Sequence, residues 1–301
     1  MMRNCFALFV VGLACLVGAS AWGEDSKSSP PPDAVFAAMM KAWQAPAEPM
    51  HVAGPIYFVG TRGLGVWLIT SPAGHILLGG GMPPSTSLIV DSIRKLGFKV
   101  EDIKILLSNH AHFDHVGTLA ELKKLSGGKV MAMEQDVALL ASGGKTDYLF
   151  AKEDRLHFPP VTVDRALKDG DTVELGGVKL TAHLASGHTR GCAVYTMTVD
   201  EGGQKYAVVF ADGTSVNPGT KLMHEPSYPG ILEDYRRTFA LLESLKPDIF
   251  LAYHVDDFGF PAKRERAAKE GVRVFVDLEG YRSFIEGRKA KFEGLVEKEK
   301  P

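Results

Sequence analysis

A dense group of metal-binding side chains lies in residues 108–117, Ser-Asn-His-Ala-His-Phe-Asp-His-Val-Gly. Three imidazoles and one carboxylate occupy six positions there: His110, His112, Asp114 and His115. A catalytic zinc takes three protein ligands, so this group exceeds the needs of one ion and predicts two. A solvated polar loop is the alternative interpretation, but such a loop has little structural use for four potential ligands.

The residues around this group predict its place in the fold. Residues 103–108 form a short apolar run typical of a buried strand, and residues 114–125 continue with helical apolar spacing. The group therefore occupies a strand-to-helix loop, which is where α/β proteins place their chemistry.

Two histidines further along the chain complete the predicted site. His188 follows the predicted strand 178–184, and His254 follows the apolar run 249–253. Both are expected at strand ends on the same edge as the first group. We divide the six ligands into His110, His112 and His188 for a first zinc, and Asp114, His115 and His254 for a second. Asp114 is also expected to orient a hydroxide between the ions, because zinc lowers the pKa of bound water to about 7.

Strand and helix patterns predict one domain with two sheets. Strands are expected at 56–59, 66–70, 75–78, 172–174, 178–184, 193–199 and 206–211, and helices at 34–43, 84–96 and 232–245. Residues 145–168 lack periodicity and are expected to form a long surface loop. No linker separates the two strand-rich blocks. The predicted class is therefore α/β, an αβ/βα sandwich of two β-sheets packed face to face with helices on both outer faces.

The first residues have the pattern of an export signal. Arg3 precedes the apolar run 5–17, and residues 19–21, Ala-Ser-Ala, match the site that a signal peptidase accepts. We expect a signal peptide at 1–21, a disordered lead-in at 22–33 and a single domain at 34–301. Cys192 would then be the last remaining cysteine, so no intramolecular disulfide is expected. We interpret Cys192 as a buried strand residue, not as a ligand or nucleophile.

Composition argues against two classes of partner. The chain has 34 lysines and arginines against 36 acidic residues, so no basic excess points to nucleic acid. No apolar run after the leader reaches the ~20 residues that a membrane helix needs. We therefore expect no membrane contact after cleavage, and we expect a monomer.

Longer motifs resemble a known family. The pattern His-x-His-x-Asp-His, with the later Gly-His-Thr-x-Gly and a final ligand histidine, resembles the metallo-β-lactamase superfamily. Residues 59–64, 68–77, 96–102, 109–115, 163–165 and 232–239 look like subclass B3. This resemblance implies a periplasmic enzyme of a Gram-negative bacterium that opens the β-lactam ring of penicillins, cephalosporins and carbapenems. It also implies two zinc ions per chain, held at positions that match all six ligands.

Three positions depart from that family's pattern. Gly79 stands where the family carries an aspartate that supports the ligands, Arg190 where it carries a proline, and Gly213 where it carries a serine. Thr214 and Ser215 are then our candidates for binding a substrate carboxylate, although they could equally just close a turn.

Two other functions remain open. Lactonases and glyoxalase II-like thioesterases share this fold, and they commonly use a further bridging aspartate, for which Asp212 is a candidate. An exported zinc-binding protein with a decayed site is the third possibility, suggested by Gly79. The intact set of six ligands argues against decay.

Overall fold

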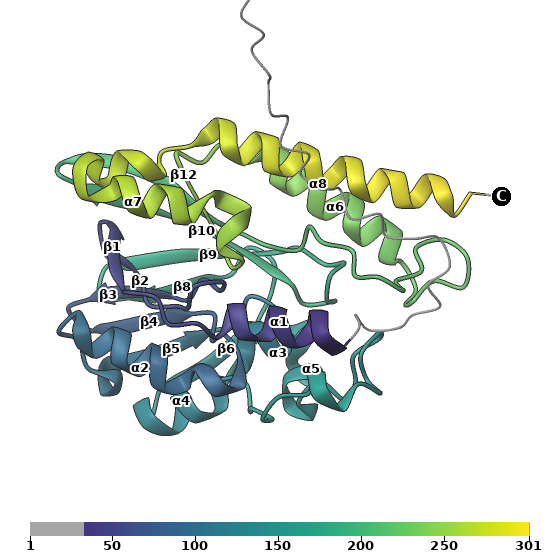
Figure 1. The fold of residues 1–301 in the computed structure, drawn as a ribbon, viewed down its shortest axis with the longest axis horizontal. Helices are drawn as coiled ribbons and strands as arrows, with labels where there is room; N and C mark the ends of the chain where they lie inside the picture. The colour runs from purple at the N-terminus through teal and green to yellow at the C-terminus, as the bar shows by residue number, and fades with distance from the viewer. Residues whose placement is uncertain (1–32, 301) are drawn as a thin grey trace, which may run out of the picture.

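Two β-sheets pack face to face in the computed structural model, which describes residues 33–300 (Figure 1). The first sheet has the order β1-β2-β3-β4-β5-β6-β7, and the second has the order β12-β11-β10-β9-β8. The strands are β1 Met50–Ala53, β2 Ile56–Phe58, β3 Trp67–Ser71, β4 Gly74–Leu78, β5 Ile103–Leu107, β6 Lys129–Met133, β7 Arg165–Leu167, β8 Thr172–Leu175, β9 Val178–Leu184, β10 Ala193–Glu201, β11 Gln204–Ala211 and β12 Ile249–Ala252.

Helices cover the outer faces of both sheets. In Figure 1, α2 and α4 lie outside the first sheet, and α6, α7 and α8 lie outside the second. The helices are α1 Asp33–Trp43, α2 Thr86–Lys95, α3 Phe113–Val116, α4 Leu119–Ser126, α5 Val137–Ser142, α6 Ile231–Ser244, α7 Phe260–Glu270 and α8 Leu278–Lys298. The predicted αβ/βα sandwich is therefore confirmed. Within residues 33–300, no helix is both long and apolar enough to cross a membrane.

Most of the N-terminal segment for which predictions were made lies outside the described residues. The predicted signal peptide and residues 22–32 of the predicted lead-in lie outside the described residues. Asp33, the last residue of that lead-in, is instead the first residue of α1.

The structure differs from the predicted elements at three places. The single helix expected over 114–125 is two helices, α3 and α4, separated at Gly117 and Thr118. Gly117 N donates to Gly81 O at 2.8 Å, and a Cβ at residue 117 would meet Pro83 at 2.3 Å. This close approach ends α3 after one turn. The other two differences are short edge strands: β1 was not predicted, and β7 lies inside the expected surface loop.

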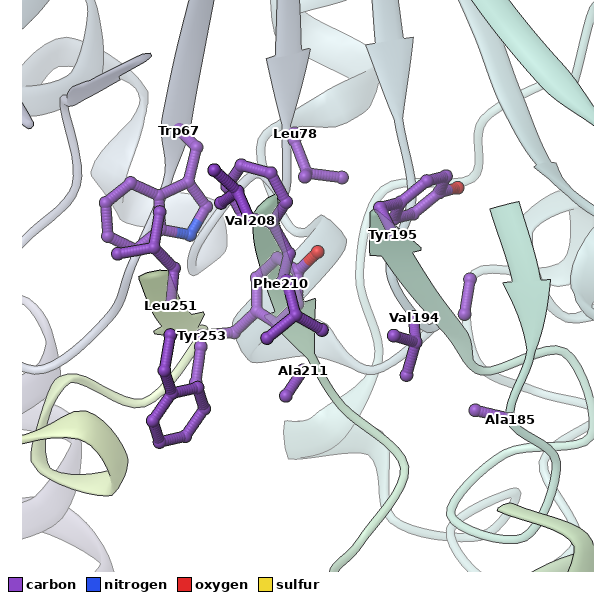
Figure 2. Close-up of a cluster of buried hydrophobic side chains, with 14 of the residues drawn as sticks. Trp67, Leu78, Ala185, Val194, Tyr195, Val208, Phe210, Ala211, Leu251 and Tyr253 are labelled. Atoms are coloured by element: carbon purple, nitrogen blue, oxygen red, sulfur yellow. The ribbon is translucent and has the colours of Figure 1, made fainter. Parts of the chain in front are cut away.

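Aromatic side chains fill the space between the sheets. Trp67 of β3 is fully buried, and its ring centroid lies 5.6 Å from that of Phe58 and 6.0 Å from that of Phe210. Phe210 belongs to β11 of the opposite sheet, so this contact joins the two layers. Figure 2 shows side chains of both sheets, including Leu78, Tyr195 and Phe210, gathered in this core.

Several strand ends meet at one edge of the sandwich. β9 and β11 both pair antiparallel with β10, and β11 pairs parallel with β12. β9, β11 and β12 therefore run the same way and end at the same edge. Two hydrogen bonds tie this edge to the end of β5: Ala193 N donates to Asn109 O at 2.7 Å, and Tyr195 Oη donates to Ser108 O at 2.9 Å. Loops after β5, β9, β11 and β12 are thus brought together.

The Trp67 contact predicts a large loss of stability on truncation. Trp67→Ala should lower the free energy of unfolding by about 3–5 kcal/mol, because it opens a cavity between the sheets. The control Leu125→Ala removes a side chain that is 48% exposed and should change it by less than about 0.5 kcal/mol. Urea unfolding of both variants measures the difference. Similar values for the two would contradict this account of the core.

Candidate metal centre

The six predicted ligands converge at the edge described above. Two lie in the loop after β5, two lie in α3, one lies in the loop after β9, and one lies two residues after the end of β12. They are His110, His112, Asp114, His115, His188 and His254. Five of the six are at most 8% exposed, whereas the His254 side chain is 37% exposed. The cluster therefore opens to solvent at His254.

Three histidines form the first group. The nitrogens of His110, His112 and His188 that face one another all lie within 4.8 Å. His112 Nδ1 and His188 Nε2 are 3.1 Å apart. Three buried imidazoles this close have no apolar packing reason to meet, and their geometry suits a shared cation.

The other ring nitrogen of each histidine has a protein partner. His110 Nδ1 is 2.7 Å from Asp212 Oδ2, and His188 Nδ1 is 2.8 Å from Ser215 O. His112 Nε2 is 3.3 Å from Asp147 Oδ2. At His110 and His188, a proton shared with the acceptor leaves the opposite nitrogen unprotonated and directed into the cluster. At His112, burial lowers the pKa, but the contact with Asp147 outweighs it and raises the pKa of this ring. This pattern is typical of metal-binding histidines.

Burial and charge make these residues fit a metal ion. His110 Nε2 is buried and has no hydrogen-bond partner within residues 33–300, which leaves a lone pair free for a cation. Burial lowers the pKa of His110 to about 4, despite the opposing charge of Asp212. Burial and the neighbouring His110 also hold the pKa of His188 well below its usual range. Both rings are thus neutral at pH 7, the form that binds metal.

The second group contains the carboxylate. His115 Nε2 lies 3.2 Å from both Asp114 Oδ2 and His254 Nε2, and the last two atoms are 3.7 Å apart. Burial alone raises the pKa of Asp114, but the nearby His115 and His254 outweigh it and hold that pKa well below its usual range. Asp114 is therefore ionised at neutral pH. The predicted division into two groups of three is compatible with these distances.

The family model described as the Metallo-beta-lactamase superfamily matches residues 65–254, which contain all six of these side chains. The chain belongs to the metallo-β-lactamase superfamily. The superfamily consists of metallo-hydrolases, and the buried histidine cluster can bind metal.

Solved structures of this superfamily resemble the chain closely. The native metallo-β-lactamase from Legionella gormanii is 41% identical with a TM-score of 0.83, over 85% of this chain and 97% of that one. A subclass B3 metallo-β-lactamase of Bradyrhizobium japonicum is 40% identical with a TM-score of 0.81, over 86% of this chain and 97% of that one. The predicted resemblance to subclass B3 is confirmed.

Curated proteins that are more distantly related in sequence are named for a different activity, the hydrolysis of hydroxyacylglutathione. A hydroxyacylglutathione hydrolase of Maricaulis maris is 24% identical over 216 residues, 71% of this chain and 69% of that protein. A protein of the same name from Rhodopseudomonas palustris is 26% identical over 163 residues, 54% of this chain and 52% of that protein. The latter match thus spans about half the length of the relative.

Asp212 supports a ligand in this metallo-β-lactamase fold. Its Oδ2 accepts from Asn109 Nδ2 at 2.7 Å and lies at the same distance from His110 Nδ1. Its Oδ1 accepts from Gly213 N at 2.8 Å. Both carboxylate oxygens therefore already have protein partners, and Asp212 acts by fixing the orientation of His110.

Two of the three departures from the family pattern have a structural explanation. Gly213 has φ +80°, and a Cβ there would meet Ala185 O at 2.7 Å, so a serine does not fit this backbone. Gly79 has φ +79°, and the Tyr253 ring lies 3.4 Å from where its Cβ would be. Support for the ligand segment comes instead from the backbone, since Gly80 N donates to His115 O at 2.6 Å.

Asp136 is an important residue that the sequence did not reveal as functional. It is fully buried, and its Oδ2 accepts from Ala111 N at 3.0 Å and from Thr189 Oγ1 at 2.7 Å. Its Oδ1 accepts from Gly191 N at 2.7 Å. Asp136 therefore holds the loop of His110 and His112 against the loop of His188. The one sequence signal was its position three residues after the end of β6, which pairs with the strand that precedes His110.

Asp147 was also missed, because it lies in a loop with no local pattern. Its Oδ1 accepts from Leu149 N and Phe150 N, both at 2.7 Å, which leaves Oδ2 directed at His112. The adjacent Tyr148 Oη is 3.1 Å from both Gly187 O and His188 O. This loop therefore positions two histidines of the first group.

The remaining sequence candidates lie at or beside the cluster. Thr214 and Ser215 line the same pocket as His110 and His188, and Ser215 Oγ is 3.1 Å from His188 Nδ1. Their contact with a substrate stays a prediction. Cys192 is fully buried directly before β10, and burial raises the pKa of its thiol well above the usual range. A protonated thiol is a poor ligand and a poor nucleophile, although its sulfur lies near His110 and Asp212.

The contacts of Asp136 predict its effect on metal binding. Asp136→Asn replaces one acceptor oxygen by an amide donor, so Ala111 N and Thr189 Oγ1 lose their partner. The affinity for the first zinc should fall about 10- to 100-fold. Stepwise zinc titration by calorimetry measures the affinity for the first zinc. The control is Asp91→Asn, at a side chain that is 66% exposed. Unchanged first-zinc affinity in Asp136→Asn would contradict the positioning role.

Proposed function

We propose that this chain is a di-zinc β-lactamase that opens the β-lactam ring of penicillins, cephalosporins and carbapenems. The supporting observation is the match to β-lactamases at about 40% identity over 97% of their chains, together with the convergence of six candidate ligands at one edge of the sandwich. The match to the thioesterases is only 24–26% identical. The reaction class would be hydrolysis of a cyclic amide.

The residues suit this chemistry. The two groups of three ligands would each hold a zinc ion, which would supply an acidic water and polarise the substrate carbonyl. Asp114 is the single carboxylate among the six ligands, so its oxygen can accept a hydrogen bond from the attacking water and orient it. Thr214 and Ser215 line the same pocket and can donate hydrogen bonds to a substrate carboxylate.

A glyoxalase II-like thioesterase is the second candidate, favoured by the names of the curated relatives. Thioesterases of this fold commonly use an aspartate that bridges the two metal ions, and Asp212 is the candidate for that residue in this chain. Asp212 Oδ1 accepts from Gly213 N, and Oδ2 contacts Asn109 Nδ2 and His110 Nδ1, which suits a role in orienting His110. This arrangement favours the β-lactamase.

We also propose that the protein acts in the periplasm. The support is the sequence of residues 1–21, with a basic residue, an apolar run and a small-x-small site. A periplasmic enzyme would meet β-lactams before they reach their targets at the cell wall.

A substrate panel tests the proposed activity. Zinc-loaded protein, purified from the osmotic-shock extract of cells expressing the full chain, is offered a chromogenic cephalosporin, a carbapenem, an acyl-homoserine lactone and a hydroxyacylglutathione. We expect turnover of both β-lactams, abolished by a chelator and restored by zinc. Chelator-sensitive turnover of the lactone or thioester alone would reject the β-lactamase. Absence of the protein from the extract would reject the periplasmic location.

The two zinc sites should respond differently to a change at Asp114. Asp114→Asn removes the charged ligand of the second group, so second-zinc affinity should fall about tenfold or more while the first zinc is retained. Turnover should fall as well, because the amide no longer orients the water in the same way. Zinc content per chain after dialysis measures the first effect, with Asp91→Asn as the control. Full two-zinc occupancy in Asp114→Asn would contradict the assignment.

A further inference from the structure

A long connection between β11 and α6 runs beside the metal centre. It comprises residues 212–230, which contain no helix or strand. Thr214 and Ser215, in its first part, line the pocket that contains His110 and His188. Long connections beside a site commonly shape it, and they keep one position only where other segments hold them.

The first part of this connection is held at Ser215. The carbonyl oxygen of Ser215 accepts from Tyr235 Oη of α6 at 2.9 Å and lies 2.8 Å from His188 Nδ1. Tyr235 is fully buried, so its ring has little freedom to move. The backbone at Ser215 is therefore fixed independently of the residues further along the connection.

The second part of the connection closes on itself. Lys221 N donates to Ser227 Oγ, and Ser227 N donates to Lys221 O, both at 2.9 Å. We call residues 221–227 the closed loop. Glu225 within it has φ +47°, the single positive φ of a residue other than glycine within residues 33–300. Such a conformation persists only where surrounding contacts hold the backbone, so the closed loop needs an anchor.

Glu299 supplies that anchor from the end of α8. Its two carboxylate oxygens each lie 3.0 Å from Leu222 N, and Oε2 also accepts from Met223 N at 2.7 Å. Leu222 is 2% exposed, so its amide needs an acceptor inside the protein. The backbone of Glu299 is itself held by the helix, because its N–H donates to Leu295 O and Val296 O at 3.2 Å.

The closed loop also adjoins the opposite side of the site. Tyr228, the residue that follows it, packs on Tyr148 with 5.2 Å between the ring centroids. Tyr148 Oη in turn donates to Gly187 O and His188 O, both at 3.1 Å. The closed loop therefore lies between α8 and the segments that border the metal pocket.

We propose that Glu299 is a positioning residue: its carboxylate latches the closed loop to α8 and so keeps the residues between Ser215 and Lys221 in one arrangement beside the metal pocket. A carboxylate that accepts from backbone amides forms charge-assisted hydrogen bonds, which are stronger than neutral ones. Because Tyr235 holds Ser215 separately, the latch acts on the wall of the pocket and not on the orientation of His188. The effect on substrate rests on the proposed function, whereas opening of the closed loop is measured without any substrate.

Trypsin cleavage after Lys221 measures the latch directly. The Lys221 side chain is 57% exposed, but the peptide bond that trypsin cuts leads to Leu222 N, which Glu299 holds. Cleavage therefore requires the closed loop to open, and its rate follows the population of the open form. In the zinc-loaded full chain, Glu299→Ala should raise the rate of cleavage at this bond at least about tenfold, because two amides lose a charged acceptor. Mass spectrometry of the released peptides gives the rate.

Glu297 provides a matched control at the same end of α8. It is 63% exposed and pairs with Lys300, outside the closed loop. Glu297→Ala removes the same charge and should change the cleavage rate by less than about twofold. Glu299→Gln keeps one acceptor oxygen without the charge and should give an intermediate rate. A rate that is unchanged in Glu299→Ala, or that rises equally in Glu297→Ala, would overturn the proposal.

Steady-state kinetics separate positioning from a loss of folded protein. With a substrate that the wild type hydrolyses in the panel described above, Glu299→Ala should raise KM about fivefold, while kcat stays within about twofold and the zinc content is unchanged. A loss of folded protein would instead lower the apparent kcat and leave KM as it is. Faster cleavage after Lys221 with an unchanged KM would overturn the positioning role. If no substrate in the panel is hydrolysed, the proposed function fails, and the cleavage rates still decide whether Glu299 latches the closed loop.

Discussion

The hydrogen bond between Asp212 and His110 fixes the orientation on which the metal centre depends. At 2.7 Å it places the imidazole proton on Nδ1 and directs Nε2 into the cluster. The same arrangement recurs at His188, through a backbone carbonyl, and at His112, through Asp147. Asp212 and Ser215 lie in the loop after β11 and Asp147 lies in the loop after α5, whereas the three histidines lie after β5 and β9. The centre therefore forms only when these segments meet.

The packing of the two sheets brings these segments together, and hydrogen bonds of Asp136 hold two of them in contact. A buried carboxylate is costly to remove from water, and three donors offset part of that cost at Asp136, whose pKa burial still raises. Those donors come from the two loops that carry the first group of ligands, so the same bonds that satisfy the carboxylate also set the spacing of the histidines. Backbone bonds support α3, where Gly80 N donates to His115 O. The absence of a side chain at Gly79 is therefore compatible with an ordered ligand set.

The sequence pointed to the six side chains that converge in the structure, because the signals for these residues are local. His110 to His115 are adjacent, and His188 and His254 each follow an apolar run that ends at the same edge. The supporting residues could not be predicted in the same way. Asp136 bonds backbone nitrogens 25 and 55 positions away, and such partners depend on the folded arrangement. β1 and β7 were missed because edge strands of three or four residues carry too little alternation to be recognised.

The position of bound zinc tests the central claim most directly. Crystals of the zinc-loaded full chain, measured at the zinc absorption edge, give the metal positions independently of activity. We predict two anomalous peaks: one about 2.0–2.1 Å from His110 Nε2, His112 Nδ1 and His188 Nε2, and one beside Asp114, His115 and His254. Asp212 should remain on His110 Nδ1. A single peak held by Cys192 and Asp212, or two peaks bridged by the Asp212 carboxylate, would contradict the account.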